Sequence, residues 1–368
     1  MNHDYMRQAL DLARQGLGLT SPNPAVGAVL VGEGEVVGSG FHTYAGVKHA
    51  EVLALEQAGE RARGATLYLT LEPCCHMGRT GLCTDAIVAA GVRRVVAAME
   101  DPNPRVSGAG FRRLREAGIE VEIDAAYTPE AERLNEPFAR FMRSGLPLVM
   151  LKAALTLDGK IAAPDDNRGW ITSEKARAHV QQLRHQSDAI LTGIGTVLSD
   201  DCMLTDRTGL ERSRPLLRIV ADSQLRLPLT SRMVETARGD VLAATTSAAS
   251  AERRRAIEAR GIRVVTFDGP GGRVNLPALV AYLGRESYLS LMVEAGSKLN
   301  WAVLESGAAD KVFFYYAPKI LGGMQSLPVI GGTGRRSRKD AIRFRNVTLH
   351  HIGASDEFAV EAYLVKER

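Results

Sequence analysis

The pattern His49-Ala50-Glu51, followed by Glu72-Pro73-Cys74 and then Cys83, constrains this chain more than any other feature. One His and two Cys supply three ligands for a tetrahedral zinc ion and leave the fourth position for water. Bound zinc lowers the pKa of that water enough to give hydroxide near neutral pH. Glu51 lies two residues past the His, where it can carry protons instead of binding the metal. The pattern predicts a catalytic zinc centre.

A structural zinc knuckle is the alternative interpretation of these ligands. A closed structural site normally takes four protein ligands. Cys75 is available as a fourth, but adjacent cysteines rarely both reach one metal, and a structural site leaves Glu51 unexplained. The division between three ligands and one proton-carrying Glu is instead that of the zinc nucleobase deaminases.

The spacing between the two cysteines departs from the common deaminase closure P-C-x-x-C. Eight residues separate Cys74 from Cys83, and a loop of that length can carry groups that bind substrate. His76 and Arg79 are the candidates on it, and the cationic Arg79 suits a substrate phosphate. A deaminase acting on nucleic acid, such as a tRNA-editing type, would instead predict the short closure and a basic groove.

Size and charge limit the classes of function. A chain of 368 residues is long enough for two domains. The net charge of +4, from 46 basic and 42 acidic residues, is too balanced to indicate a nucleic-acid binder. The start of the sequence lacks the features of a signal peptide, and no apolar stretch has membrane-spanning length. Three of four cysteines cluster near a His, which favours a metal site in a reducing compartment, and we expect a cytoplasmic protein.

Alternating helix and strand signals predict an α/β protein of two domains, residues 1–146 and 147–368, with the boundary near Arg143–Pro147. We expect helices over residues 4–15, 49–62, 85–90, 174–186 and 298–305, the fourth with Ser173 as its N-cap. We expect strands over residues 26–31, 36–41, 65–71, 94–99, 148–154, 189–192, 217–221, 241–245, 289–293, 312–316 and 359–365.

The second half has no G-x-G-x-x-G fingerprint, so a standard Rossmann site is not expected. Two other strand ends carry glycine, at residues 192–196 and 294–297, and the second opens a helix. Backbone N–H groups at such a helix start can bind phosphate, although a tight turn between strand and helix explains each signal equally well. Polar residues near strand ends, Lys152, Asp200, Arg207 and Glu294, are candidates for a site or simply solvated.

Motifs along the whole chain resemble those of the bifunctional deaminase/reductase family of bacterial riboflavin biosynthesis. The matching segments are Pro22–Gly27, His49–Glu51, Glu72–Cys83, Leu157–Lys160, Trp170–Ser173, Gly195–Leu198, Asp200–Asp201, Ala221–Ser223, Val293–Gly296 and Ala317–Lys319. The resemblance implies an N-terminal cytidine-deaminase-like fold and a C-terminal dihydrofolate-reductase-like fold. It also implies removal of the 2-amino group of a diaminopyrimidinone carrying a ribosylamino 5′-phosphate, then NADPH-dependent reduction of the ribosylamino group to ribitylamino. The implied cofactors are Zn²⁺, one per deaminase site, and NADPH.

The resemblance also assigns roles to residues. In the deaminase half it makes Glu51 catalytic, His49, Cys74 and Cys83 the zinc ligands, and Asn23, His42, His76 and Arg79 substrate contacts. In the reductase half the NADPH contacts are Ala154, Trp170, Thr196, Asp200, Ser223, Gly296, Ser297, Lys298, Leu299, Asn300, Trp301 and Ala302. The substrate contacts there are Lys152, Arg184, Leu204, Arg207 and Glu294, while Arg168 stands where the family often has a small polar residue.

The expected partner is a small pyrimidine ribosyl phosphate, with no nucleic acid and no membrane, and we expect a homo-oligomer, a dimer or tetramer. Two other hypotheses compete with this one. The first is a nucleic-acid or nucleoside deaminase fused to a nucleotide-binding module. The second is a non-catalytic zinc module fused to a nucleotide-sensing domain, against which the presence of Glu51 argues.

Overall fold

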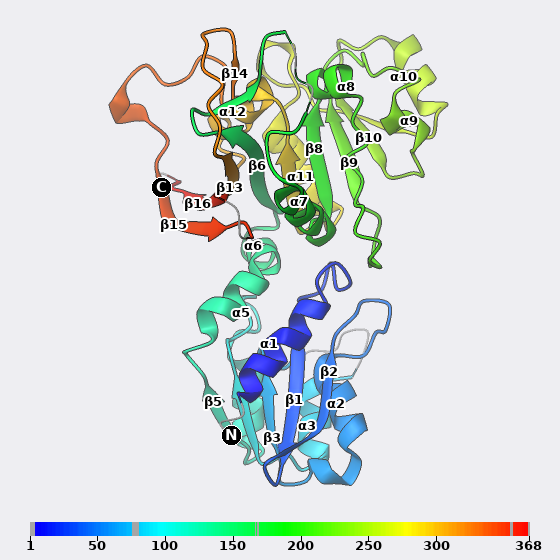
Figure 1. Cartoon of the computed structure of the whole chain (residues 1–368). Coiled ribbons are helices and arrows are strands. Elements are labelled where there is room, and N and C mark those ends of the chain that lie inside the picture. Colours follow the sequence, from blue (N-terminus) through cyan, green and yellow to red (C-terminus); the bar gives the residue numbers. More distant parts are fainter. Residues whose placement is uncertain (1–3, 76–80, 166, 168, 354–355, 367–368) are drawn as a thin grey trace. The chain divides into compact units, whose positions relative to one another are not determined.

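The computed structural model describes residues 4–75, 81–165, 167, 169–353 and 356–366. The chain forms two compact units, one of Met1–Gly145 with Glu211–Arg214 and one of Leu146–Leu210 with Pro215–Arg368 (Figure 1). Each unit has its own main sheet and its own apolar core, as the α/β class predicts. Within the described part of the chain, no helix combines the length and apolar character that crossing a membrane requires.

The first unit is built on a five-stranded sheet of order β2-β1-β3-β4-β5, in which β1 is antiparallel to both neighbours and β3, β4 and β5 are parallel. Its strands are β1 (Gly27–Gly32), β2 (Glu35–Phe41), β3 (Thr66–Leu69), β4 (Arg94–Ala97) and β5 (Glu120–Ile123). Its helices are α1 (Tyr5–Gln15), α2 (Ala50–Ala58), the 3-10 turn η1 (Gly59–Ala62), α3 (Cys83–Ala89), α4 (Ala109–Glu116), α5 (Thr128–Leu134) and α6 (Glu136–Ser144).

Glycines in the β1–β2 hairpin allow helices to pack closely against it. A Cβ at Gly27 would lie 2.0 Å from the backbone oxygen of Ala9 in α1, and one at Gly38 would lie 2.1 Å from that of Ala54 in α2. Any larger residue at either position would push a helix away from the sheet. The hairpin therefore fixes the position of α2, whose first turn contains Glu51.

Helix α2 is shorter than the predicted span of residues 49–62. His49 is its N-cap, and the helix ends at Ala58 because Gly59 adopts a φ of +56°. A short 3-10 turn then continues to Ala62. Helix α3 begins earlier than predicted, at Cys83 instead of Asp85.

The second unit is built on a nine-stranded sheet of order β11-β10-β9-β8-β12-β6-β13-β16-β15. The strands from β11 to β13 run parallel, whereas β16 and β15 are antiparallel to their neighbours. Its strands are β6 (Leu148–Thr156), β8 (Ala189–Gly193), β9 (Leu217–Ala221), β10 (Val241–Thr245), β11 (Arg263–Thr266), β12 (Ser290–Glu294), β13 (Lys311–Ala317), β15 (Phe344–His351) and β16 (Phe358–Leu364). A separate ribbon pairs β7 (Lys160–Ala162) with β14 (Leu327–Pro328).

The helices of the second unit complete two apolar clusters that share this sheet. They are α7 (Glu174–Gln186), α8 (Ile194–Asp200), α9 (Arg232–Glu235), α10 (Ala251–Glu258), α11 (Leu276–Arg285) and α12 (Ser297–Glu305), with 3-10 turns η2 (Pro270–Gly272) and η3 (Arg338–Asp340). The predicted bounds of α7 are confirmed, and the Ser173 side chain accepts a hydrogen bond from the Ala176 amide as an N-cap. Helix α8 was not predicted, because its first turn carries glycine at position 195.

Candidate active sites

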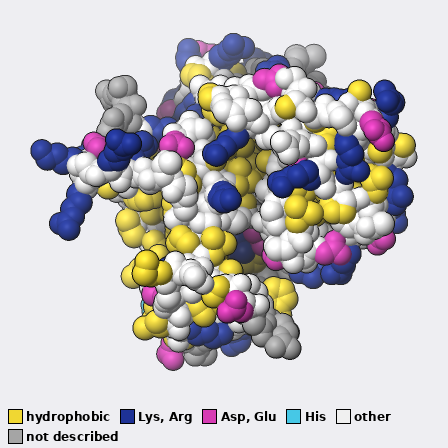
Figure 2. All heavy atoms as spheres, turned by 90° about the horizontal axis from the view of Figure 1, so that it is seen from above, with side chains coloured by type: hydrophobic (Ala, Val, Ile, Leu, Met, Phe, Trp, Pro, Cys, Tyr) yellow, Lys and Arg dark blue, Asp and Glu magenta, His cyan; other side chains and the backbone are white. Residues whose placement is uncertain are grey.

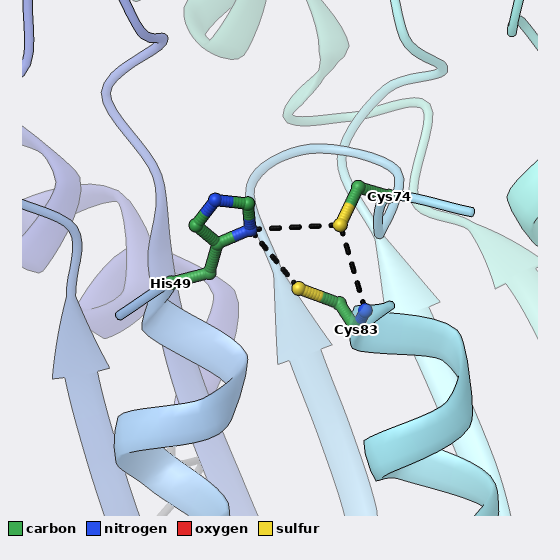
Figure 3. A group of neighbouring side chains, drawn as sticks. All are labelled: His49, Cys74 and Cys83. Carbon is green, nitrogen blue, oxygen red and sulfur yellow. Dashed lines mark hydrogen bonds between the residues drawn. The ribbon is translucent and has the colours of Figure 1, made fainter. Parts of the chain in front are cut away.

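His49, Cys74 and Cys83 converge in the first unit (Figure 3). His49 Nδ1 lies 3.0 Å from the Cys83 sulfur and 3.6 Å from the Cys74 sulfur, and the Cys83 amide donates to the Cys74 sulfur at 3.5 Å. The three ligand atoms all lie within 4.8 Å of one another. One imidazole nitrogen and two sulfurs at this spacing fit the donor set of a tetrahedral zinc ion with one open position.

The local fold explains why these side chains meet. His49 is the N-cap of α2, Cys83 is the first residue of α3, and Cys74 follows β3 on a loop. Helix N-termini favour negative charge, so the start of α3 suits a thiolate. Two of the three predicted zinc ligands, His49 and Cys83, therefore lie at the starts of helices.

Without a bound metal, the hydrogen bond between the two thiols shifts their pKa values in opposite directions. The hydrogen bond from Cys83 lowers the pKa of Cys74, against the effect of burial. The same hydrogen bond, together with burial, raises the pKa of Cys83. A bound dication removes this conflict, because a thiol that coordinates a metal is deprotonated. The electrostatics of the pair thus fit a metal better than two free thiols.

Glu51 lies beside the ligands with its carboxyl group buried. Its side chain is 4% exposed, and its Oε2 has no hydrogen-bond partner among the described residues. Burial raises its pKa above the ordinary value, although the nearby His49 opposes that shift. A buried polar atom without a partner is costly, so its presence here points to a ligand or water that it would meet.

Asn23 and His42 lie next to the ligands. The Asn23 amide nitrogen donates to His42 Nε2 at 2.9 Å, and His42 Nδ1 donates to the Lys48 backbone oxygen at 2.9 Å. The His42 ring contacts the His49 ring edge to face, with centroids 5.1 Å apart. The structure therefore brings both residues to the site. The other two predicted contacts of this half, at positions 76 and 79, lie outside the described residues.

Asn135 supports this group and was missed from the sequence. It is buried, its Oδ1 accepts from the Ala25 amide at 2.8 Å, and its Nδ2 donates to the Ala25 oxygen at 3.0 Å. These two bonds fix the segment that carries Asn23. The contact spans 110 residues, so no local pattern indicated it.

Glu72 holds the loop that carries Cys74. Its Oε2 accepts from the amides of Asp101 and Gly108 at 3.0 and 2.9 Å, and its Oε1 accepts from those of Gly110 and Phe111 at 2.8 and 3.3 Å. The carboxylate is buried at the start of α4. A Cβ at Gly110 would lie 2.2 Å from the Pro73 oxygen, so only glycine permits this approach. Glu72 is adjacent to the ligand loop, but the sequence did not indicate its partners.

Charged side chains also converge in the second unit. Glu294 in β12 is in register with Lys152 in β6, and the Lys152 ammonium donates to Glu294 Oε1 at 3.2 Å. Arg184 of α7 donates to both oxygens of Glu294 through Nη2 at 2.9 and 3.0 Å, and to Oε2 through Nε at 3.1 Å. Burial alone would raise the pKa of Glu294, but the charges of Lys152 and Arg184 lower it to about 2. The carboxylate is therefore ionised at neutral pH.

Four of the predicted cofactor positions lie at the carboxyl ends of neighbouring strands. Ala154 lies in β6, Gly296 follows β12, Thr196 follows β8 and Ser223 follows β9. These four strands are consecutive in the sheet. A Cβ at Gly296 would lie 3.6 Å from Thr196 Oγ1, so the starts of α8 and α12 are adjacent. Ligands of open α/β sheets bind at this edge.

The start of α12 carries buried polar atoms that lack partners in the described part of the chain. They are Ser297 Oγ, Asn300 Oδ1 and Trp301 Nε1. Lys298, Leu299 and Ala302 belong to the same helix. Trp170 is 70% exposed beneath the Arg177 guanidinium, 4.7 Å from its ring centroid, and Asp200 is exposed at the end of α8. Nothing in these contacts joins Trp170 or Asp200 to the other cofactor positions.

Two predicted substrate positions lie on the irregular segment after α8. Leu204 is buried with a φ of +54°, and Arg207 is exposed. Near Lys152, the sequence missed a pair in which the buried Tyr315 shares a hydrogen bond of 2.7 Å, through its Oη, with Nδ1 of the half-buried His179. Lys152 lies 5.9 Å from the centroid of the Tyr315 ring. Position 168 lies outside the described residues.

The first unit has the sheet, ligands and buried Glu of a zinc-dependent deaminase, and it shares its chain with an α/β unit of a second kind. Comparisons with known proteins agree with this class. The family model "Cytidine and deoxycytidylate deaminase zinc-binding region" matches residues 1–99, and the model "RibD C-terminal domain" matches residues 147–356. The chain belongs to the RibD family, the bifunctional deaminase/reductases of riboflavin biosynthesis.

Individual relatives cover nearly the whole chain. The riboflavin biosynthesis protein RibD of Actinobacillus pleuropneumoniae is 42% identical over 350 residues, covering 95% of this chain and 92% of the relative. The solved structure of Acinetobacter baumannii RibD, form 1, has a TM-score of 0.85 and 36% identity, covering 98% of each chain. The diaminohydroxyphosphoribosylaminopyrimidine deaminase/5-amino-6-(5-phosphoribosylamino)uracil reductase of Thermotoga maritima has a TM-score of 0.80 and 35% identity, covering 98% of each chain.

The family assignment confirms several predictions from the sequence. The first unit has the cytidine-deaminase-like fold, and the second has the dihydrofolate-reductase-like fold of RibD C-terminal domains. The zinc ligands are His49, Cys74 and Cys83. The bifunctional deaminase and reductase assignment stands, and the nucleic-acid deaminase and the non-catalytic zinc module are set aside.

Proposed function

We propose that this chain deaminates 2,5-diamino-6-(5-phosphoribosylamino)pyrimidin-4(3H)-one and then reduces the ribosylamino group to ribitylamino with NADPH. Residues 1–146 would form the deaminase domain and residues 147–368 the reductase domain. The relative from Thermotoga maritima bears the names of both activities. The observation that carries the deaminase half is the meeting of His49, Cys74 and Cys83 beside the buried Glu51.

In the deaminase half, bound zinc would acidify its water and so supply the nucleophile. Glu51 would carry a proton to the leaving 2-amino group, because its buried carboxyl group interacts with the ligands and its Oε2 has no hydrogen-bond partner among the described residues. Asn23 and His42 contact the pyrimidine, and the hydrogen bonds between them and to Lys48 fix their orientation. His76 and Arg79 remain predicted substrate contacts of the loop between the cysteines.

The variant Glu51→Gln tests this assignment. Zinc content should equal that of the parent, while ammonia release should fall by about 10²- to 10⁴-fold, the usual contribution of a general acid–base. Glu56→Gln is the matched control, because Glu56 lies in the same helix but is exposed and paired with Lys48. Ammonia release that survives Glu51→Gln would show that another group carries the proton.

In the reductase half, NADPH would bind across the carboxyl ends of β9, β8, β12 and β6, with its phosphates at the start of α12. The support is the adjacency of Thr196 and Gly296 and the unpartnered polar atoms of Ser297, Asn300 and Trp301. The remaining predicted cofactor contacts are Ala154, Trp170, Asp200, Ser223, Lys298, Leu299 and Ala302. When bound, the cofactor supplies hydride for C1′ of the sugar.

The substrate of that half would meet Lys152, Glu294 and Arg184, which form one ion-paired group, and Leu204 and Arg207 on the segment after α8. The ion pair with Glu294 orients Lys152, so that its ammonium can donate to the sugar. The exposed Arg207 guanidinium is available for the 5′-phosphate.

A coupled assay of the zinc-loaded protein tests both halves at once. Ammonia release and NADPH oxidation are followed together from the diaminopyrimidinone ribosyl phosphate. Ammonia should appear first, and NADPH loss should depend on it. Ammonia without NADPH loss would leave the deaminase intact and refute the reductase assignment.

The partner we propose is this small molecule alone, with no nucleic acid and no membrane, in a cytoplasmic protein. Figure 2 supports the first exclusion, because Lys and Arg side chains on the face shown are interspersed with acidic and apolar ones. The cysteine usage supports a reducing compartment. Assembly into a dimer or tetramer remains a prediction, which the molar mass in solution tests.

A further inference from the structure

An irregular segment of the second unit, residues 201–208, is tied to one face of α7. It joins α8 to the approach of β9 and contains no helix or strand. Backbone groups outside helices and ladders need other partners when they are buried. Here Gln181 and Arg184 of α7 bind two such backbone groups, and His185 of the same helix contacts a side chain of the segment. Residues three and four apart lie on one face of a helix, so these contacts form a continuous stripe.

The contacts of this stripe are specific. Gln181 Oε1 accepts from the Arg207 amide at 2.9 Å, and Arg184 Nη1 donates to the Thr205 oxygen at 3.0 Å. His185 Nδ1 lies 2.9 Å from Asp206 Oδ2, and the two side chains are only 7% and 8% exposed. The other oxygen of Asp206 accepts from the amide and hydroxyl of Thr208 at 2.9 and 2.8 Å.

The segment is held in a conformation that it would not adopt unaided. Leu204 has a φ of +54°, a left-handed conformation that costs roughly 1 kcal/mol for a residue with a Cβ. Its side chain is nonetheless buried. The contacts from α7 offset this cost and fix the backbone on both sides of Asp206.

Arg207 differs from its neighbours because its backbone is fixed while its side chain is exposed. Among the residues that the structure describes, none forms an ion pair or hydrogen bond with its guanidinium. A cation without a partner on a fixed backbone suits an anionic ligand, because little order remains to be lost on binding. Arg184, in the same turn of α7 as His185, also binds Glu294, so one turn of helix holds both parts of the proposed site.

We propose that Gln181 and His185 are positioning residues of the reductase site: they fix the segment 201–208 so that the Arg207 guanidinium meets the substrate phosphate. Neither residue touches substrate itself. This inference rests on the proposed role of Arg207 as a phosphate contact. The polar face of α7 would thus contribute to the preference of the reductase site for a phosphorylated sugar.

The first test compares Gln181→Met with Gln182→Met. Gln182 is the neighbouring residue of α7, is exposed, and its side chain forms no hydrogen bond with the residues that the structure describes. NADPH oxidation is measured with the deaminated pyrimidine ribosyl phosphate as the substrate. The loss of one hydrogen bond should raise its KM by about three- to tenfold, with kcat within twofold. Gln182→Met should leave both constants unchanged. Ammonia release by the same protein serves as the internal standard for folded enzyme.

The second test uses the His185–Asp206 pair. His185→Leu should raise KM by about tenfold or more, because it leaves the buried Asp206 carboxylate without this partner. His185→Asn should restore most of the affinity, since its amide can donate from nearly the position of Nδ1. Backbone amide exchange in residues 201–208 should be faster in His185→Leu and Gln181→Met than in the parent and in Gln182→Met.

The outcomes separate the inference from the function on which it rests. A parent that releases ammonia but never oxidises NADPH refutes the proposed reductase function. A parent that does reduce, with an unchanged KM in both Gln181→Met and His185→Leu, refutes the positioning role even if amide exchange is faster. A fall in kcat at constant KM also refutes it, because the change would then act on the chemical step.

Discussion

Replacing Glu72 by Gln should weaken zinc binding although Glu72 does not touch the metal. The carboxylate accepts four backbone N–H groups, two at each oxygen. In the variant an NH₂ group replaces one of the two carboxylate oxygens. Whichever way the side-chain amide is turned, this NH₂ group faces two backbone N–H donors and can accept from neither. Hydrogen bonds to a charged group contribute about 1.5–3 kcal/mol each. Two lost bonds give an upper bound of about 3–6 kcal/mol, and with relaxation we expect unfolding to become easier by about 3 kcal/mol.

Part of the lost stability must affect how firmly Cys74 is held, because Cys74 is two residues from Glu72 in the chain. Residues that orient a metal ligand typically change metal affinity by about 10- to 100-fold when replaced. That range corresponds to about 1.4–2.7 kcal/mol of zinc-binding free energy, which is within the loss calculated for the hydrogen bonds of Glu72.

The assay is zinc competition against a chromogenic chelator at neutral pH, with urea unfolding of the metal-free protein measured in parallel. Glu100→Gln is the matched control, because Glu100 is exposed and, among the described residues, its side chain accepts a hydrogen bond only from the Ser107 hydroxyl. It should change stability by less than about 0.5 kcal/mol. Zinc affinity of Glu72→Gln within twofold of the parent would refute the argument and restrict Glu72 to supporting α4.

Two further substitutions test other close contacts. Gly110→Ala places a Cβ 2.2 Å from the Pro73 oxygen, so it should cost about 1–3 kcal/mol in urea unfolding and weaken zinc binding, whereas Gly195→Ala meets nothing within 4 Å and should be neutral. Glu294→Gln should abolish NADPH oxidation and spare ammonia release. Because the pKa of Glu294 is lowered to about 2 from 4.5, its ionised form stabilises the fold above pH 4.5 and that contribution is lost as the pH falls towards 2. The parent should therefore exceed Glu294→Gln in unfolding free energy by on the order of 3 kcal/mol at pH 7, with the difference vanishing in acid; a difference that does not depend on pH would contradict the assignment.

The zinc site could be predicted from the sequence because its chemistry is concentrated in short motifs. His49 and Glu51 are separated by one residue, and Cys74 and Cys83 flank one loop. Residue type and spacing then suffice to indicate a metal and a proton carrier. The ends of β9, β10 and α7 were equally local, because apolar runs and the Ser173 cap mark them.

Elements without such local marks were missed. Strand β15 is largely exposed, so its apolar residues do not alternate with polar ones against a core. Helix α8 begins with glycine in its first turn, and this suggested a loop. Helices α5 and α6 bury one residue each, so little of a core-facing stripe marks them in the sequence. In each case contacts with distant parts of the chain decide the structure.

The missed functional residues share one physical cause. Ligand-bearing loops have backbone N–H and C=O groups that no helix or ladder satisfies, so buried side chains must bind them. Glu72 does this for the start of α4 beside the Cys74 loop, Asn135 for the Asn23 segment, and Gln181 for the Arg207 segment. Each acts on backbone far away in sequence, which leaves no motif. The sequence thus indicates the groups that meet a ligand, whereas only the fold indicates the groups that hold them in place. Substitutions of the second kind should change affinity for zinc or substrate without removing any atom that contacts either.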